Sequence, residues 1–195
     1  MEHGLAFALG CLRHPRRMGA IAPASRALAR AIRDEVLRSE PGVLIEVGAG
    51  TGAITRALAP ALAAQGRFVV FERDPEFAEL LRASFPQLEV LNHCASRVDL
   101  LTMAADTPVT LVSSLPLLSM PGDEARDCIE AMLTLIARQP RSRLIQYTYA
   151  ARHLRPFSGI PAGWRWRRAA SVWANLPPAT VWALEQAPLS HNGIH

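Results

Sequence analysis

Residues 43–52 read VLIEVGAGTG, and this stretch decides the fold. A short hydrophobic run, typical of a buried strand, leads into a turn with glycine at every second position: Gly48, Gly50 and Gly52. Glycines so placed sacrifice backbone entropy, which is tolerated where the chain turns tightly and another molecule approaches closely. The stretch therefore predicts a strand that ends at the binding turn for an adenosine-containing cofactor.

Strands and helices alternate along the rest of the chain. We expect strands at 43–47, 67–72, 88–91, 109–113 and 143–149, and helices at 23–38, 51–63, 76–84 and 123–137. Residues 171–184 read as two further strands joined across 175–179. Alternation of this kind implies parallel pairing through crossover connections. The predicted fold is α/β, a Rossmann-like sheet that resembles the class I methyltransferases, with N-terminal helices and an antiparallel β-hairpin closing the parallel strands.

A chain of 195 residues is long enough for one domain with a substantial core. We expect residues 1–40 to form an amphipathic helical arm of that domain, residues 41–187 to form the methyltransferase-like domain, and residues 188–195 to be a disordered tail. Every basic residue is an arginine: residues 1–38 hold seven against three acids, residues 39–137 six against thirteen, and residues 138–195 eight against one. An acidic middle therefore lies between two basic ends.

The cysteines predict the compartment. Cys11, Cys94 and Cys128 are scattered and form no CxxC motif, which favours reduced thiols and a cytoplasmic location. The N-terminus does not follow the signal-peptide pattern, because its short apolar segment precedes its positive charges. No window of about 20 residues is free of charges and helix breakers, so we expect no transmembrane helix.

An acid before the glycine turn distinguishes two cofactors. The turn formally satisfies the nicotinamide fingerprint G-x-G-x-x-G/A through Ala53. Glu46, however, lies two residues before the first glycine, where it would repel a pyrophosphate and attract the ammonium group of an amino acid. Glu72 follows at the end of the second strand, where a carboxylate can accept the ribose hydroxyls of either cofactor. The sequence thus favours S-adenosylmethionine.

Two segments resemble the first motifs of S-adenosylmethionine-dependent methyltransferases: EVGAGTG at 46–52 and FERD at 71–74. From these and from the ends of the third and fourth strands we assign the cofactor-binding residues Glu46, Gly48, Ala49, Gly50, Gly52, Glu72, Arg73, Cys94, Ala95 and Ser113. One position departs from the pattern. Such enzymes usually have an Asp where Cys94 stands, to accept from the adenine amino group, and a thiol is a weak acceptor. A non-catalytic member that binds only cofactor or lipid therefore stays open.

The segment after the fourth strand, SSLPLLSM at 113–120, is where acceptor specificity is expected. Methyltransferases that act on nucleobase amines resemble one another in an N/D/S-P-P-Y/F/W motif, whose aromatic residue stacks on the base. Here Ser114, Leu115, Pro116 and Leu117 occupy that place, so the stacking platform, worth about 1–3 kcal/mol, is missing. We assign these four residues to the substrate site, where an aliphatic wall suits an acyl chain or a flexible amine.

Taken together, the segments resemble the bacterial phospholipid N-methyltransferases. The resemblance lies in residues 7–26, in the glycine motif, in 71–77 with 85–86, in 113–120, and in QYTY at 146–149 with VWANLPPA at 172–179. It implies stepwise methylation of phosphatidylethanolamine to phosphatidylcholine at the inner face of the cytoplasmic membrane, with no metal and no nucleic-acid partner. The head group is not fixed, since an ornithine lipid also fits. The alternative is an rRNA adenine N-methyltransferase.

The amine must be neutral when it attacks, so the site needs groups that can hold it. Tyr147 and Tyr149 are the catalytic candidates; we expect them to point to opposite faces of their strand, so that at most one faces the site. His153, between two arginines, is a further candidate base.

Membrane contact is expected from the N-terminal arm. Arg13, Arg16 and Arg17 follow an apolar segment at 5–12, an arrangement suited to an interface with anionic lipids. The GWRWRR segment at 163–168 is a second candidate. The alternatives are that the arm packs on the sheet as an extra core helix and that the Trp side chains pack in the hairpin.

Overall fold

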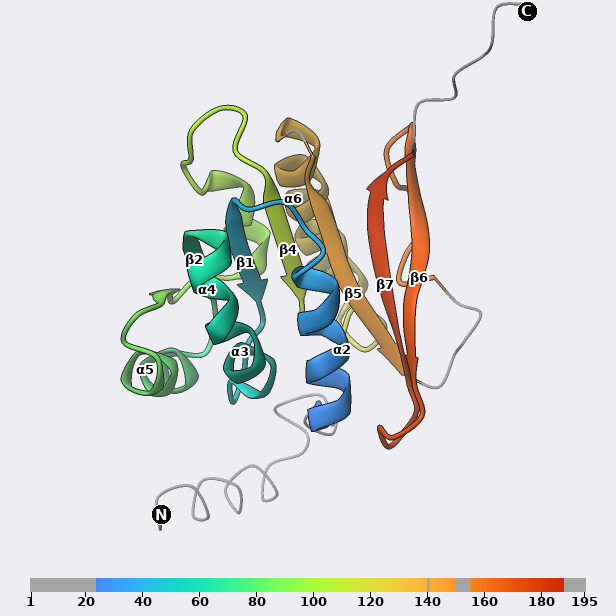
Figure 1. Cartoon of the computed structure of the whole chain (residues 1–195). Helices are drawn as coiled ribbons and strands as arrows, with labels where there is room; N and C mark the ends of the chain where they lie inside the picture. Colours follow the sequence, from blue (N-terminus) through green and yellow to red (C-terminus); the bar gives the residue numbers. More distant parts are fainter. Residues whose placement is uncertain (1–23, 140, 150–154, 188–195) are drawn as a thin grey trace, which may run out of the picture.

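The computed structural model describes residues 24–139, 141–149 and 155–187, which form one seven-stranded sheet with helices on both faces (Figure 1). The strands are β1 (Val43–Val47), β2 (Arg67–Phe71), β3 (Glu89–Leu91), β4 (Val109–Ser113), β5 (Arg143–Tyr149), β6 (Trp164–Val172) and β7 (Ala179–Gln186). Their order is β3-β2-β1-β4-β5-β7-β6. Strands β1 to β5 are parallel, and the β6–β7 hairpin adds to β5 through antiparallel β7. The predicted fold class is confirmed.

Two helical layers enclose the sheet. The helices are α2 (Arg26–Val36), α3 (Ala53–Leu58), α4 (Leu62–Gln65), α5 (Pro75–Ser84) and α6 (Gly122–Arg138), with 3-10 turns η1 (Ala59–Ala61) and η2 (Ala95–Leu100). Helices α2, α3 and α5 bury apolar side chains against one face, and α6 and η2 against the other. Because the central strands are covered on both sides, β1 and β4 are buried along their whole length.

Several expected elements differ from the structure by one to three residues at an end, and two differ by more. The helix expected over 51–63 breaks into α3, η1 and α4, because Pro60 has no N–H to donate to the helical ladder. The first hairpin strand begins at Trp164 rather than at Ser171, so that it includes residues 164–168 of the GWRWRR segment. Trp166 is buried, and its Nε1 donates to the carbonyl of Phe157 at 3.2 Å. For Trp166, the alternative that the Trp side chains pack in the hairpin therefore holds.

The register of the parallel strands places the site. Val47 is level with Phe71 of β2 and with Ser113 of β4. The residues that follow these strands therefore leave the sheet side by side at its carboxyl edge. Open α/β sheets bind their ligands at this edge, where the strand order reverses.

The hairpin turn anchors the first described helix. Asn175 is buried in the turn between β6 and β7, and its Oδ1 accepts from the backbone N–H of Ser25 at 3.0 Å. Its Nδ2 donates to the carbonyl of Pro177 at 2.7 Å, which fixes the amide in place. Ser25 in turn caps α2 by accepting from the N–H of Leu28. The WANLPP segment thus connects the β6–β7 hairpin to the N-terminus of α2.

A buried acid reinforces this junction. Glu35 of α2 is 3% exposed and accepts from Arg167 of β6, while Arg143 of β5 lies 3.5 Å from the same carboxylate. Arg167 also pairs with Glu185 of β7 at 3.1 Å. One carboxylate therefore ties α2 to two strands of the sheet.

Replacing Glu35 tests this network. Glu35→Gln leaves two arginines without their buried counter-charge, and we expect the free energy of unfolding to fall by about 2 kcal/mol. The matched control is Asp34→Asn, which breaks the exposed pair with Arg33 and is expected to cost less than about 0.5 kcal/mol. Urea unfolding followed by circular dichroism measures both. Equal effects would show that the Glu35 network contributes no more than a surface pair.

Candidate functional site

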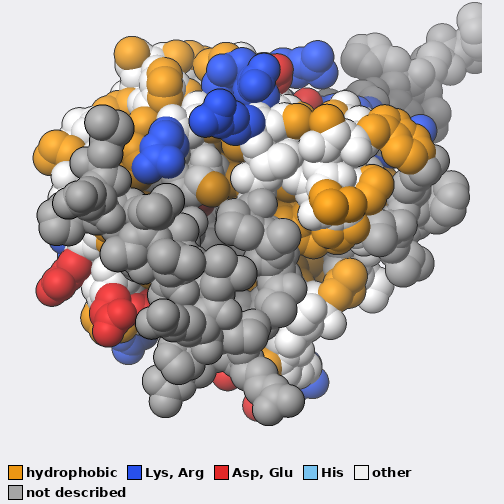
Figure 2. Space-filling view, turned by 90° about the horizontal axis from the view of Figure 1, so that it is seen from below, with side chains coloured by type: hydrophobic (Ala, Val, Ile, Leu, Met, Phe, Trp, Pro, Cys, Tyr) orange, Lys and Arg blue, Asp and Glu red, His pale blue; other side chains and the backbone are white. Residues whose placement is uncertain are grey.

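The expected cofactor residues gather at the carboxyl edge of β1, β2 and β4, at the lower end of the sheet in Figure 1. Figure 2 views the molecule from this end, where hydrophobic side chains form several patches and basic side chains cluster along one edge. Within the described residues, no group of three or more His, Cys, Asp or Glu side chains is arranged to hold a metal ion.

The glycine turn is tight on one side and open on another. Gly48, Gly50 and Gly52 have φ of 73°, 53° and 76°, a left-handed conformation that other residues adopt only with strain. A Cβ on Gly48 would lie 2.6 Å from Leu115 Cδ2, so this glycine lets the loop after β4 pack against the turn. A Cβ on Gly50 would meet no atom of the described residues within 4 Å. The open space that a cofactor requires therefore lies over Gly50.

Glu72 orients the turn. Its carboxylate is 5% exposed and accepts from the N–H of Gly50 at 2.7 Å and from the N–H of Asp74 at 2.9 Å. Each oxygen has one backbone donor, and each carboxylate oxygen can accept a second hydrogen bond. Glu72 can therefore hold the glycine turn and still accept ribose hydroxyls, the role that the sequence predicts for it.

Glu46 is a fully buried acid at the centre of the site. Burial is the main cause that raises its pKa to about 7, and the nearby hydroxyls of Thr55 and Ser114 offset part of this rise. Ser114 Oγ donates to Glu46 Oε1 at 3.4 Å, whereas Oε2 is buried and has no partner among the described residues. A buried carboxylate oxygen without a partner is costly. It fits the ammonium group of S-adenosylmethionine, and a diphosphate would add negative charge beside it.

The region after β3 holds two of the expected cofactor residues, Cys94 and Ala95. Cys94 precedes η2, and partial burial raises the pKa of its thiol, but hydrogen bonds with Ser96 and Cys128 and the charge of Arg73 outweigh this, so that the pKa is lowered. The thiol thus has a partner on α6. Ala95 is buried in the core.

Arg73 and its neighbour Asn92 have structural contacts. The guanidinium of Arg73 pairs with Glu124 of α6 at 3.0 Å. Asn92 Nδ2 donates to the carbonyls of Glu72 and Arg73 at 2.9 and 3.0 Å, which fixes the turn after β2. The sequence analysis does not assign Asn92 to the site, although its position directly after β3 is a signal for it.

The loop after β4 is held from three sides. The N–H of Ser114 donates to the carbonyl of Val47 at 2.9 Å, and Ser113 Oγ accepts from the N–H of Leu115 at 3.4 Å. Gln146 of β5 donates to the carbonyl of Leu115 at 3.2 Å. Leu117 is 9% exposed and packs in the core between the sheet and α6. Of the four expected substrate residues, Leu117 is thus buried away from solvent.

Sequence reasoning missed Gln146. A glutamine in the buried part of β5 was the signal, because a buried amide needs partners. Its Nε2 holds the loop after β4, and its Oε1 is buried without a partner among the described residues.

The tyrosine pair contradicts one expectation. Tyr147 and Tyr149 lie on the same face of β5, with ring centroids 5.4 Å apart in an edge-to-face arrangement. The expectation of opposite faces was wrong, because residues two apart in a strand share a face. Burial is the main cause that raises the pKa of Tyr147, whose hydroxyl also hydrogen-bonds with Tyr149 and Ser114. This hydroxyl therefore stays protonated near pH 7.

Four candidates, Arg13, Arg16, Arg17 and His153, lie outside the described residues, as do the N-terminal part of the arm and the 188–195 tail.

No protein-family model matches the chain. It is 31% identical over 130 residues to an ornithine lipid N-methyltransferase of Singulisphaera acidiphila, an alignment that covers 64% of this chain and 68% of the relative. It is also 31% identical over 91 residues to ribosomal RNA small subunit methyltransferase A of Chlorobium phaeobacteroides, covering 47% of this chain and 33% of that protein.

Among solved structures, the 23S rRNA methyltransferase ErmE superposes with a TM-score of 0.58 at 17% identity, covering 86% of this chain and 71% of ErmE. A TehB-like SAM-dependent methyltransferase from Corynebacterium glutamicum gives a TM-score of 0.56 at 14% identity, covering 95% and 98%. These two likenesses establish the fold.

The pKa of Glu46 makes cofactor binding depend on pH. A cation beside Glu46 favours its ionised form, so binding releases a proton wherever the free site is protonated. We expect the affinity for S-adenosylhomocysteine, which carries the same ammonium group, to rise about tenfold between about pH 6 and pH 8. In Glu46→Gln the affinity should be weaker and this pH dependence lost. Titration calorimetry measures both, and an unchanged pH dependence in the variant would contradict the assignment.

Protein stability should show the opposite dependence in the absence of cofactor. The pKa of Glu46 in the folded protein lies above its unfolded value, so its contribution to stability is complete below the unfolded pKa. It is lost as pH rises towards about 7. Relative to Glu46→Gln, the wild type is therefore expected to lose stability over this window.

The open space over Gly50 can be tested with a matched pair. Gly50→Ala and Gly163→Ala both place a Cβ at a positive φ, with no neighbour within 4 Å in the part of the chain that the structure describes, so each is expected to cost about 1 kcal/mol of stability. Only Gly50→Ala should weaken S-adenosylhomocysteine binding, by about tenfold or more, because a methyl group fills the space that the cofactor needs. Equal binding by both variants would place the cofactor elsewhere.

Proposed function

The chain belongs to the class I S-adenosylmethionine-dependent methyltransferases, and we propose that its methyl acceptor is the amine of a lipid head group. The sequence resemblance favours phosphatidylethanolamine, methylated towards phosphatidylcholine. The relative from Singulisphaera acidiphila makes an ornithine lipid the second head group to test. Both lipids present a primary amine on a flexible chain.

The loop after β4 is the observation that supports a lipid amine over a base. Leu117 stands where nucleobase amino-methyltransferases carry their stacking aromatic, and it is buried in the core. Neither its chemistry nor its place offers a platform for a flat base. A small amine needs only polar groups to hold it, and Ser114 and Tyr147 supply hydroxyls at this edge.

The residues present fit S-adenosylmethionine. Glu46 would hold its ammonium group, Glu72 its ribose hydroxyls, and the open turn at Gly50 leaves room for it. When bound, this cofactor supplies an electrophilic sulfonium methyl group, so the protein mainly has to position the acceptor in line with it.

The acceptor amine must arrive neutral, since its lone pair forms the new bond. Burial of an amine disfavours its charged form. The Tyr147 hydroxyl stays protonated, so it positions the amine by hydrogen bonding rather than taking its proton. Ser114 lies between Tyr147 and Glu46 and would fix the direction of that hydroxyl.

We also propose that the enzyme works at the inner surface of the cytoplasmic membrane. Exposed apolar side chains support this: Trp173 is 60% and Leu176 87% exposed, both in the turn that connects β6 to β7. That turn lies at the carboxyl edge of β5, because Ala179 pairs with Tyr149. Within the described residues, no helix has the length and apolar character needed to span a bilayer.

Adenine methylation in ribosomal RNA is the second candidate, favoured by the match to ribosomal RNA small subunit methyltransferase A. Radiolabelled S-adenosylmethionine offered with phosphatidylethanolamine vesicles, ornithine-lipid vesicles or unmethylated ribosomal RNA separates the candidates. We expect label in a lipid. Label in RNA alone would refute the lipid proposal, and label in neither, with cofactor binding retained, would favour a non-catalytic member.

The tyrosine pair gives a residue-level prediction. Tyr147→Phe should lower kcat about tenfold to a hundredfold with little change in cofactor affinity, because one positioning hydrogen bond is lost. Tyr149→Phe is the matched control on the same face, and we expect a smaller effect because its link to Ser114 runs through Tyr147. A larger loss in Tyr149→Phe would reverse the assignment of the two hydroxyls.

A further inference from the structure

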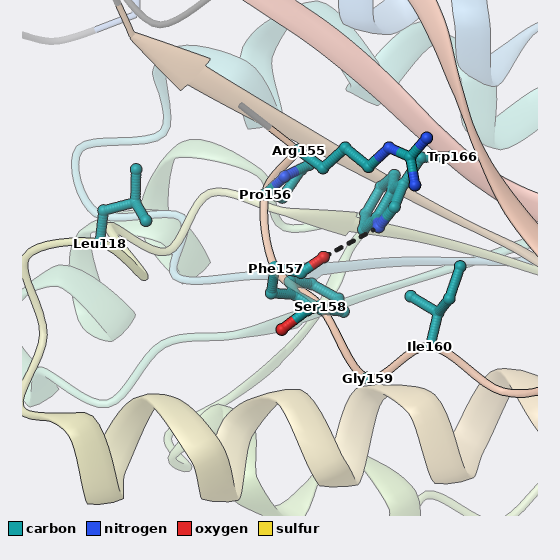
Figure 3. A pocket seen from close by; sticks show the side chains of 8 residues that line it. All are labelled: Leu118, Arg155, Pro156, Phe157, Ser158, Gly159, Ile160 and Trp166. Atoms are coloured by element: carbon teal, nitrogen blue, oxygen red, sulfur yellow. Dashed lines mark hydrogen bonds between the residues drawn. The ribbon is translucent and has the colours of Figure 1, made fainter. Parts of the chain in front are cut away.

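A pocket of about 480 Å³ lies beside the loop after β4, between Leu118 and the segment that precedes β6 (Figure 3). Its volume is within the range of small-molecule sites, about 300–1,000 Å³. Ligand sites of that kind are mostly apolar with a few polar groups that fix orientation. None of its lining residues belongs to the cofactor site described above.

The inner wall of this pocket is rigid and apolar. The rings of Phe157 and Trp166 lie edge to face, with centroids 5.1 Å apart. Trp166 Nε1 donates to the carbonyl of Phe157, so the polar atom of the indole is already used within the protein. Ile160 completes the wall on the far side (Figure 3). What remains accessible is hydrocarbon and aromatic surface, which binds apolar chains by the hydrophobic effect.

One charge stands at this apolar site. Of the lining residues, all within the described part of the chain, Arg155 alone is charged, and no acid lines the pocket with it. A guanidinium can bind phosphate or carboxylate with two parallel hydrogen bonds. The pocket therefore combines an apolar wall with a single charged group that can bind an anion. This combination matches an amphiphile that carries one negative charge near its hydrocarbon chain.

The position of the pocket links it to the reaction. Leu118, which is 68% exposed, directly follows the four expected substrate residues 114–117. Arg155 follows β5, the strand that carries Tyr147 and Tyr149. The two tyrosines pack on the α2 side of the sheet, whereas Phe157, Ile160 and Trp166 pack on the α6 side. The loop after β4 is therefore the segment that contributes both to the expected substrate residues and to the pocket.

We propose that this pocket binds an acyl chain of the lipid substrate, with Arg155 pairing with the anionic group that joins the chain to the amine. The inference rests on the proposed function, because it takes the acceptor to be a lipid. The anion would be the phosphate of a phosphatidylethanolamine or the carboxylate of an ornithine lipid.

The test measures binding first and methyl transfer second. The probes are lysophosphatidylethanolamines of increasing acyl-chain length, below their micelle concentration, titrated calorimetrically into the full chain with S-adenosylhomocysteine. An N-acyl ornithine series distinguishes carboxylate from phosphate. Each added methylene should raise affinity up to about fourfold until the pocket is full, after which affinity should level off.

Two matched pairs of variants locate the binding. Leu118→Glu should weaken binding of the longest chains about tenfold and flatten the dependence on chain length, because a carboxylate enters the apolar site. Its control is Leu100→Glu, since Leu100 is also 68% exposed but lies on η2, outside the pocket. Arg155→Gln should weaken binding of the probes that carry a phosphate or a carboxylate about tenfold and leave monoacylglycerol unaffected. Its control is Arg97→Gln, on η2 outside the pocket, which should change neither.

The outcomes separate this inference from the proposed function. Affinity that does not depend on chain length, or equal effects of Leu118→Glu and Leu100→Glu, would overturn the pocket assignment even if lipid amines are methylated. Chain-length-dependent binding that Leu118→Glu abolishes would support the pocket even if no methyl group reaches the lipid, in which case the proposed reaction fails and the binding site stands.

Discussion

The Glu72 carboxylate fixes the backbone at the candidate cofactor site, because its two oxygens accept hydrogen bonds from two different turns. Through the N–H of Gly50 it fixes the glycine turn after β1, and through the N–H of Asp74 it fixes the entry to α5. A carboxylate bonded to backbone N–H groups keeps its position without a cationic side chain. The shape of the cofactor crevice therefore depends on an anion that is oriented before any ligand binds.

A second acid gives the crevice its selectivity. Glu46 lies at full burial within β1, with Glu72 adding to the negative potential around it. Burying a carboxylate costs free energy unless a cation or a proton neutralises it. A ligand that brings an ammonium group removes this cost, whereas a diphosphate would increase it. The same residue thus favours one adenosine cofactor and disfavours the other.

The bounds of the strands could be predicted from the sequence more accurately than the contacts between side chains. Residues 43–47, 109–113 and 143–149 form strands with the expected bounds, because hydrophobic runs of this length are typical of a sheet covered on both faces. The spacing of Tyr147 and Tyr149 already implied a shared face, and the opposite expectation misapplied the strand period. The pairing of Ser114 with Glu46, 68 positions apart, needed the register of β1 and β4. The pocket wall at Phe157 lies in a segment without periodicity, so no pattern pointed to it.

The loop after β4 shows how packing limits the choice of acceptor. Leu115 fills the space that Gly48 leaves, its carbonyl is held by Gln146, and Leu117 is part of the core. These aliphatic residues serve the internal packing of the loop, so they are not free to shape a surface for a flat, rigid base. The hydroxyls that remain at this edge suit a small amine, while the hydrocarbon of the next residue, Leu118, is turned to a neighbouring apolar pocket. An acceptor that is polar at one end and apolar at the other can hydrogen-bond with these hydroxyls and place its hydrocarbon in the pocket at the same time.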